Sequence, residues 1–330
     1  MVKKSQETEE IVKKTESGIP KLSIDVAALV KDVRGRYSAK EQHFASDAVL
    51  GDEITLPTSD DAYVLSEEVA FWKMLIGVPG IPYGRIVQIA GKPDSGKSTA
   101  AMLFMKAAQK SGALVILWDS EKKFDTVRFK NRMGGDPSQL AVSRSKSIIE
   151  GAKQVEIFVK AAKEQNPNLK IFIVWDSVGA TLNSTQDDND YSKQPGVDAK
   201  EINWVMKKFN KFIERYRNPE TAEETIAVCC INQVYANIGS VGHKEKGGSG
   251  IEYLSSVILQ LSRKKDLNKT RKGQKIKYGI LTRAKVRKNH LFSGEDCLAE
   301  LDLVVSSDGI ELADKVKSNT ELVGWDDADE

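Results

Sequence analysis

The feature that most constrains this chain is a glycine-rich loop between an apolar run and a helical pattern. The loop reads GKPDSGKS (residues 91–98), follows RIVQIA (85–90) and precedes TAAMLFMKAA (99–108). In the pattern G-x-x-x-x-G-K-[ST], backbone amides surround nucleotide phosphates, the lysine contacts the β- and γ-phosphates, and the hydroxyl binds Mg²⁺. The strand-loop-helix order therefore predicts an α/β domain with a nucleotide at a helix N-terminus.

Apolar segments along the chain alternate between two patterns. Short, nearly continuous apolar runs suit buried strands and occur at residues 86–89, 114–118, 171–175 and 226–231. Helical spacing appears between them, at residues 97–110, 150–165 and 200–216. The alternation predicts an α/β fold with a mostly parallel central sheet covered on both faces. Further β-like runs predict antiparallel strands that extend this sheet, at residues 255–262, 275–285 and 297–305.

The 330-residue chain divides into three parts. Residues 1–64 form a polar arm that contains an amphipathic segment, residues 22–33. Such a segment needs a partner surface to cover its apolar face. Residues 65–312 form the core, and residues 313–330 form a short acidic tail.

Charge and cysteine content exclude several classes of protein. The formal net charge is +2, so a polyanionic partner must be held by a local basic patch. The three cysteines are Cys229 and Cys230, within an apolar run, and Cys297, so we expect no disulfide framework. The sequence contains neither the roughly 20 consecutive apolar residues that cross a bilayer nor a hydrophobic signal core. We therefore expect a cytoplasmic protein without a membrane partner.

Two acidic residues that follow strand-like runs are candidates for nucleotide chemistry. Asp176 closes the run at residues 171–175 and suits the metal-binding aspartate of a magnesium–nucleotide site, together with Ser98. Glu121 follows another run at the same edge of the sheet, where it is suited to deprotonate a water that attacks the γ-phosphate. The alternative for either carboxylate is a helix N-cap or a solvated turn residue.

With these motifs in order, the chain resembles the RecA family of recombinases and, within it, the phage type such as UvsX. The resemblance covers residues 65–312. Besides the phosphate loop, the motifs are GIPYGRIVQI (80–89), DSE (119–121), VWDS (174–177), INQ (231–233), GG (247–248) and KVRKN (285–289). A phosphate loop alone is shared by many families, whereas this set of motifs is specific.

The resemblance implies a RecA-like ATPase core that acts as a DNA-dependent ATPase with ATP and Mg²⁺. It implies head-to-tail helical filaments on single-stranded DNA that catalyse homologous pairing and strand exchange with duplex DNA, in recombination and repair. ATP would lie between neighbouring subunits. The implied setting is a bacterial cell or a phage-infected host, where single-strand-binding and loader proteins are further candidate partners.

The resemblance also implies roles for single residues. Glu121 would activate water, and Gln233 would sense the γ-phosphate and signal to a DNA-binding loop. Lys288 and His290 match two family lysines that reach the γ-phosphate of the next subunit. Nucleotide contacts are implied for Gly91, Asp94, Ser95, Gly96, Lys97, Ser98, Thr99, Asp125 and Arg128.

Two segments are candidates for DNA contacts. The first is the glycine-rich loop at residues 234–249, which offers an aromatic group, cations and backbone amides. Its candidate residues are Tyr235, Asn237, Ile238, His243, Lys244, Lys246, Gly247, Gly248 and Ser249. The second is a helix face with Lys200, Asn203 and Lys207 at helical spacing. The alternatives are a plain surface hairpin and a solvated charged face. The segment at 183–197 is acidic and departs from the family.

Two site positions also depart from the family pattern. His290 is usually neutral near pH 7 and gives a transition state less charge than a lysine does, so Arg287 and Lys285 are candidates to compensate. Arg128 stands where the family has an aromatic residue beside adenine, although a guanidinium also stacks on a purine.

A one-sided basic run surrounds these cations. Residues 263–288 hold twelve lysines and arginines against one acidic residue, Asp266. Such a run either stays solvated or faces a polyanion.

Two other functions are compatible with the motifs. One is a ring helicase with a RecA fold, for which residues 1–60 are small and polar as an assembly domain. The other is an ATP-binding DNA filament or mediator protein that does not exchange strands. The C-terminal lobe with which bacterial family members gather duplex DNA is expected to be mostly absent. The resemblance implies that the segment at residues 22–33 serves in oligomerisation by docking on the next core, and such a head-to-tail contact favours an open filament.

Overall fold

The computed structural model describes residues 25–36, 63–65, 69–184, 196–219, 221–236, 243–245, 248–271, 274–291 and 297–314. The chain divides into two units, Met1–Thr55 and Leu56–Glu330. In the first unit, α1 (Val26–Gly35) begins within the predicted amphipathic segment. The Asp25 carboxylate caps it by accepting a hydrogen bond from the Ala28 amide at 3.1 Å, which explains why the helix begins there.

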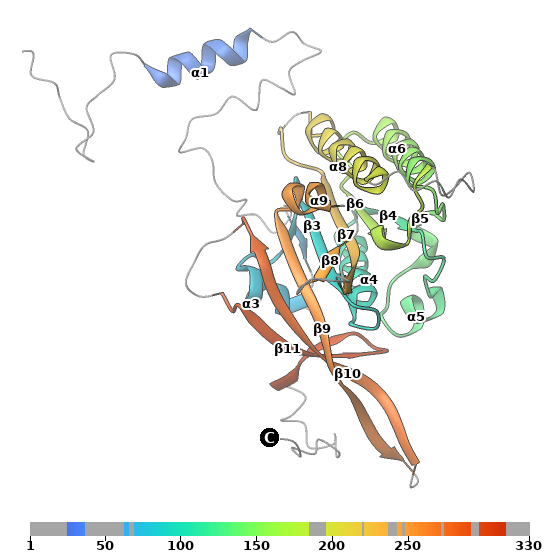
Figure 1. Cartoon of the computed structure of the whole chain (residues 1–330). Coiled ribbons are helices and arrows are strands. Elements are labelled where there is room, and N and C mark those ends of the chain that lie inside the picture. The colour runs from blue at the N-terminus through green and yellow to red at the C-terminus, as the bar shows by residue number, and fades with distance from the viewer. Residues whose placement is uncertain are drawn as a thin grey trace, which may run out of the picture. The chain divides into compact units, whose positions relative to one another are not determined.

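The second unit is built on one ten-stranded sheet (Figure 1). Five neighbours of the central path run parallel: β3 (Ile86–Gly91), β7 (Ile226–Ala236), β6 (Ile171–Asp176), β4 (Leu114–Asp119) and β5 (Leu140–Ser143). On the other side of β3 the order continues through β9 (Val257–Arg271), β10 (Gln274–Asn289), β11 (Glu300–Ser306) and β12 (Ile310–Leu312). β9 is parallel to β3, and the strands beyond it pair antiparallel. The predicted fold class is confirmed.

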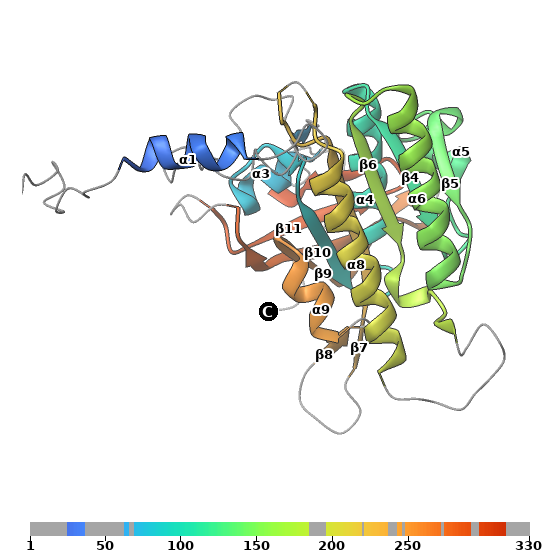
Figure 2. The same ribbon diagram turned by 90° about the horizontal axis from the view of Figure 1, so that it is seen from above.

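Helices cover both faces of this sheet. One face packs against α3 (Ala70–Ile76) and α4 (Lys97–Lys110), and the other against α6 (Ile148–Gln165), α8 (Val197–Arg215) and α9 (Gly248–Leu254). Figures 1 and 2 show α6 and α8 side by side on their face. Adjacent strand residues enter opposite layers, as Leu117 and Trp118 do. This two-sided burial is why the strands are continuously apolar.

Short elements fill the connections. A small separate sheet pairs β1 (Tyr63–Leu65) with β2 (Gly80–Pro82), and β8 (His243–Glu245) pairs with the end of β7. The remaining short helices are α5 (Thr126–Asn131), η4 (Pro137–Gln139) and η5 (Val178–Ala180). None of the helices in the described ranges is both long and apolar enough to cross a membrane.

β9 and β10 are longer than their apolar runs predict. β11 pairs with β10 only over Gly279–Lys285, so the two strands continue beyond the sheet as a two-stranded arm (Figure 1). The middle of the basic run of residues 263–288 lies along this arm, whereas residues 279–288 lie within the sheet. Because both faces of such an arm are solvated, its sequence needs no apolar alternation, and the apolar pattern underestimates its length.

Candidate nucleotide-binding site

The phosphate loop joins β3 to α4, as the sequence predicts. Gly91 ends the strand, where a β-carbon would lie 2.3 Å from the Leu261 carbonyl oxygen and 2.6 Å from the Ser95 hydroxyl. Gly96 caps α4 with φ of 96°, a left-handed conformation that favours glycine. Glycine is therefore favoured at Gly91 by close contacts and at Gly96 by its left-handed backbone conformation. Both positions help to hold the loop at the N-terminus of α4.

The Lys97 side chain folds back against the phosphate loop. Its side chain is buried, and Nζ donates a hydrogen bond to the Lys92 carbonyl oxygen at 2.7 Å. Burial lowers the pKa of Lys97, while the charges of Asp176, Glu121 and Asp94 oppose that shift. The lysine thus sits among carboxylates with its ammonium at the inner rim of the loop.

Two hydroxyl groups of the loop fit a magnesium–nucleotide. The Ser95 hydroxyl is buried and has no hydrogen-bond partner among the described residues, as expected of a group that awaits a phosphate oxygen. The Ser98 hydroxyl is hydrogen-bonded to Asp176. Mg²⁺ usually takes one or two protein oxygens and completes its shell with phosphates and water, so Ser98 and Asp176 suit it.

Asp176 ends β6 directly beside Asp119 of β4. The pKa of Asp176 is raised to about 6, mainly by burial and also by the nearby carboxylates of Glu121 and Asp119, while the Ser98 hydroxyl and Lys97 oppose the rise. A carboxylate that burial destabilises gains most when a divalent cation arrives. The electrostatics therefore agree with the predicted metal-binding role.

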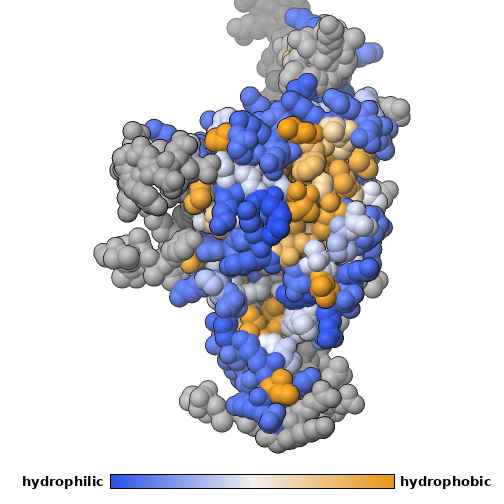
Figure 3. Space-filling model, turned by 90° about the vertical axis from the view of Figure 1, so that its right-hand side faces the viewer, coloured by the Kyte–Doolittle hydropathy of each residue, from blue (hydrophilic) through white to orange (hydrophobic). Residues whose placement is uncertain are grey.

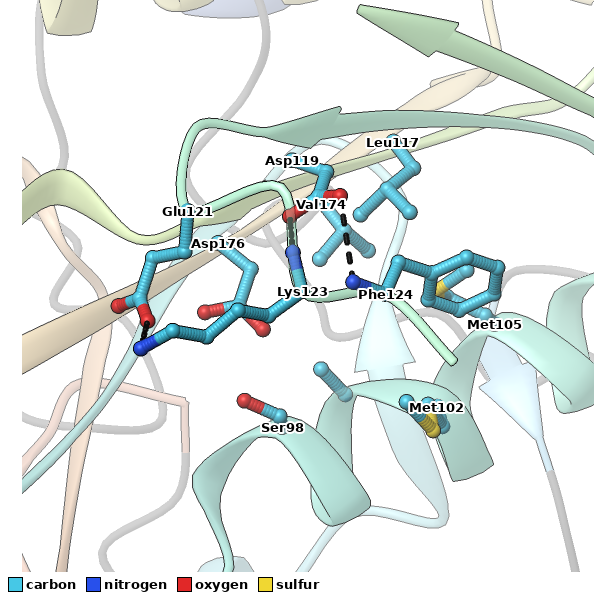
Figure 4. Close-up of a pocket in the computed structure, with 11 residues that line it drawn as sticks. Ser98, Met102, Met105, Leu117, Asp119, Glu121, Lys123, Phe124, Val174 and Asp176 are labelled. Atoms are coloured by element: carbon cyan, nitrogen blue, oxygen red, sulfur yellow. Dashed lines mark hydrogen bonds and ion pairs between the residues drawn. The ribbon is translucent and has the colours of Figure 1, made fainter. Parts of the chain in front are cut away.

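Glu121 lines one pocket with Ser98 and Asp176 (Figure 4). Three donors hold its carboxylate. Its Oε1 accepts hydrogen bonds from the Ser177 hydroxyl at 2.6 Å and from Gln233 Nε2 at 2.7 Å, and its Oε2 pairs with Lys123 Nζ at 2.9 Å. Burial alone would raise the pKa of Glu121, but these hydrogen bonds outweigh it and lower the pKa. The structure thus brings Glu121 and Gln233, which are far apart in sequence, into direct contact.

Three residues of this site escape the sequence argument. Ser177 follows Asp176 across a cis peptide bond and reaches Glu121. Asp119 binds the backbone amides of Lys123 and Phe124, at 3.1 and 3.2 Å, and so shapes the turn after β4. Lys123 then meets Glu121. The motif DSEKKFD contains two of these residues, yet nothing in it tells which lysine faces the site.

The predicted adenine-side residues form a second cluster at the start of α5. Asp125 caps that helix by accepting the Arg128 amide hydrogen bond at 2.8 Å. The Arg128 guanidinium donates to Thr99 Oγ1 at 2.9 Å and to the carbonyl oxygens of Ser306 and Ser307 at 2.8 and 3.0 Å. Arg128 therefore joins α4 to the turn after β11, and its contact with a purine stays a prediction. Asp94, by contrast, has an exposed side chain 3.9 Å from Arg263.

Lys288 and His290 lie away from this pocket. Lys288 Nζ donates to the Glu252 and Tyr253 carbonyl oxygens at the end of α9, at 2.9 and 3.0 Å. The His290 amide donates to the Ser256 carbonyl oxygen, next to the start of β3, whereas the phosphate loop follows the opposite end of that strand. Within one chain the structure separates these cations from the phosphate loop.

The DNA-contact candidates fall on α8 and on the segment after β7. Lys200 and Lys207 are exposed on α8, and Asn203 lies against Gly250 of α9. Tyr235 ends up in β7, His243 and Lys244 in β8, and Gly248 and Ser249 at the start of α9. Asn237, Ile238, Lys246 and Gly247 lie outside the described residues. The strand that carries Gln233 thus leads directly into this segment.

Comparison with known proteins gives one consistent family. The profile of the RecA N-terminal domain matches residues 38–311. Protein RecA of Roseiflexus castenholzii is 30% identical over 218 residues, which cover 65% of this chain and 56% of that protein. Protein RecA of Mesoplasma florum is 28% identical over 256 residues, and protein RecA of Macrococcus caseolyticus is 30% identical over 255 residues. These two alignments cover 75% and 76% of this chain.

The alignments do not reach the full length of these relatives. They cover 68% of the Mesoplasma florum protein and 66% of the Macrococcus caseolyticus protein. The names of the relatives do not distinguish a phage type, which stays a prediction.

Proposed function

Because this chain belongs to the RecA family, we propose that it is an ATP-dependent DNA recombinase that forms helical filaments on single-stranded DNA and catalyses homologous pairing and strand exchange. The observation that supports this best is the hydrogen bond between Glu121 and Gln233, at 2.7 Å. It connects the group suited to activate water with the strand that leads to the DNA-contact segment.

The residues around the phosphate loop divide the hydrolytic chemistry among them. Lys97 neutralises phosphate charge, and Ser98 and Asp176 hold Mg²⁺, which would offset the charge of the β- and γ-phosphates. Glu121 orients a water molecule and takes its proton. Gln233 Nε2 donates a hydrogen bond to Glu121, and a γ-phosphate would offer its amide another acceptor. Its side chain would therefore have two alternative partners, Glu121 and the γ-phosphate.

On the DNA side, α8 and the segment after β7 are joined through α9. Gly250 of α9 lies close to Asn203 of α8. A β-carbon added to Gly250 would lie 2.9 Å from Asn203 Oδ1. The exposed lysines Lys200 and Lys207 are placed to contact the phosphate backbone. A shift at Gln233 would thus be passed to both DNA-contact elements, which supports ATP-regulated DNA binding.

Assembly would supply the cations that the pocket lacks. Lys288 and His290 lie beside the amino end of β3, so in a head-to-tail array they would face the phosphate loop of the next subunit. We further propose a docking surface for this assembly. Figure 3 shows apolar side chains gathered over the side that carries α5, β5 and α6, where Val127, Val142 and Ile157 are exposed. We assign this side to the amphipathic N-terminal segment of a neighbouring copy.

Electron microscopy followed by a strand-exchange assay tests the proposal. With single-stranded DNA and a non-hydrolysable ATP analogue, we expect open helical filaments, and with ATP we expect exchange with homologous duplex. Closed rings that unwind a fork would support a helicase instead, and filaments without exchange would support a mediator. Lys200→Ala with Lys207→Ala should weaken DNA binding by about 10-fold or more, and Lys110→Ala on α4 serves as the matched lysine control.

A further inference from the structure

Hydrogen bonds hold the backbone of Lys123, whereas its side chain is mostly exposed. Its amide donates to Asp119 Oδ1 at 3.1 Å, and the next amide, of Phe124, donates to the other oxygen of the same carboxylate. Asp119 itself is buried at the end of β4. The Lys123 side chain, in contrast, is 79% exposed. The turn therefore aims this lysine while leaving its ammonium free to change partners.

The Lys123 side chain points into the nucleotide pocket. Its Nζ lies 2.9 Å from Glu121 Oε2, and Figure 4 shows the side chain passing Asp176 on its way to Glu121. The same pocket is lined by Ser98, the hydroxyl that suits Mg²⁺. Among the described lining residues of this pocket, Lys123 is the one that carries positive charge. The Lys123 ammonium thus lies beside Glu121 and Asp176, on the side of the pocket opposite α4.

The two residues expected to bring positive charge from a neighbouring subunit are less suited to contact the phosphates. His290 stands where the family has a lysine, so one of the two ammonium groups that would face the phosphate is replaced by an imidazole. Lys288 is bonded to two carbonyl oxygens at the end of α9. A cation already in the pocket needs neither a neighbour nor the release of those bonds.

We propose that Lys123 is a catalytic residue, which supplies positive charge to the γ-phosphate from within the same chain. The proposal rests on the proposed ATPase function. When ATP enters, its phosphates attract the ammonium more strongly than one carboxylate does, so Nζ moves from Glu121 to a γ-phosphate oxygen. Departure of Nζ leaves Glu121 Oε2 as an acceptor for the attacking water.

The step balances without a further reactant. The water oxygen forms a bond to the γ-phosphorus, and its proton goes to Glu121 Oε2. The bond between the γ-phosphorus and the bridging oxygen breaks, and ADP leaves with that electron pair. Lys123 keeps all its protons and acts only through its charge, which is used most when charge moves onto the phosphate oxygens.

The test compares Lys123→Gln and Lys123→Arg with the wild type, in the full chain with single-stranded DNA. We expect Lys123→Gln to lower kcat by about 10-fold to 100-fold with little change in KM, and Lys123→Arg to restore most of the rate. Lys122→Gln, the neighbouring lysine of the same turn, is the matched control and should keep the wild-type rate. In Lys123→Gln, the Kd for ADP with aluminium fluoride should increase by about the same factor by which kcat falls. The Kd for ADP alone should stay the same.

Each result separates Lys123 from the proposed function. An unchanged or higher kcat in Lys123→Gln would overturn the proposal, as would an equal loss in Lys122→Gln or an equal weakening of ADP alone. A wild type that hydrolyses no ATP would count against the ATPase function itself, and the role of Lys123 would fall with it.

Discussion

The two edges of the central sheet differ in charge and in what they hold. The carboxyl edge of β3, β4 and β6 carries the phosphate loop, Glu121 and Asp176, whereas the opposite edge carries Lys288 and His290. Lys288 pairs with Ile258 of β9, which pairs with Gln88 of β3, three residues before Gly91. That register places it roughly 10 Å along the strands and another 10 Å across them from the loop. Within one chain, Glu121 therefore lies far from these cations.

This separation teaches that the site has two possible sources of charge. A neighbour can bring Lys288 and His290 to the phosphates, or the chain can use Lys123 alone. The paired strands β3, β9 and β10 set this separation, which is longer than a lysine or histidine side chain reaches. Substitutions at one edge at a time distinguish these two sources.

Loss of Lys97 should disable the carboxyl edge altogether. We expect Lys97→Ala to lower kcat/KM for ATP by about 1000-fold, because the ammonium that neutralises the phosphates is removed from a buried position. A coupled assay for ADP release measures this, with Lys110→Ala at the exposed end of the same helix as control. Turnover within a few-fold of wild type would show that the loop does not hold the reacting phosphates.

Mixing two damaged proteins tests whether the edges meet between subunits. Glu121→Gln and Lys288→Ala should each lower the DNA-dependent ATPase rate by about 100-fold. In a one-to-one mixture, about a quarter of the interfaces join an intact carboxyl edge to an intact opposite edge, so a corresponding part of the rate should return.

The matched control for that mixture pairs two lesions on the same edge. Glu121→Gln mixed with Lys97→Ala leaves every pocket damaged, so no rate should return. If the mixture of Glu121→Gln and Lys288→Ala behaves like this control, Lys288 does not act across an interface.

The smallest expected effect concerns the hydroxyl of Ser177. It donates to Glu121 Oε1 and favours the ionised carboxylate, so Ser177→Ala should raise the pKa of Glu121 from its lowered value. The stability that ionised Glu121 contributes is present above its unfolded pKa and is lost as pH falls through its lowered folded pKa. In the variant that contribution should be smaller, and its loss should be complete at a higher pH. Carbon-13 NMR of the carboxyl group measures the shift.

Ser184→Ala provides the control for this measurement. The Ser184 hydroxyl also donates to a glutamate, Glu201 on α8, at 2.5 Å. Its removal should leave the Glu121 titration unchanged. A Glu121 pKa that is the same in Ser177→Ala and wild type would mean that Lys123 and Gln233 alone lower it.

Sequence periodicity predicts the central elements well because they are local. The helix at residues 97–110 and the strands after it follow from apolar spacing and are confirmed by α4, β4, β6 and β7. β5 has only four residues and lies at the sheet edge, where its burial is partial, so no apolar run marks it. The arm of β9 and β10 is also underestimated, since its end packs on no other strand.

The site shows the same division between local and distant information. The loop, Asp176 and Glu121 are recognisable because each follows a buried strand, and parallel strands end at one edge. The pairing of Glu121 with Ser177 and Gln233, across 56 and 112 residues, depends on which strands are neighbours. Strand order is decided by packing over the whole sheet, so spacing along the chain does not contain it.

The amino-acid sequence by itself determined the phosphate loop, the alternating strands and helices, and the residue types available for nucleotide chemistry. These follow from local backbone geometry and from which faces must be buried. Only the tertiary structure decided that Lys123 faces Glu121 while Lys288 faces α9, because two lysines of the same chemistry differ only in the surroundings that folding gives them.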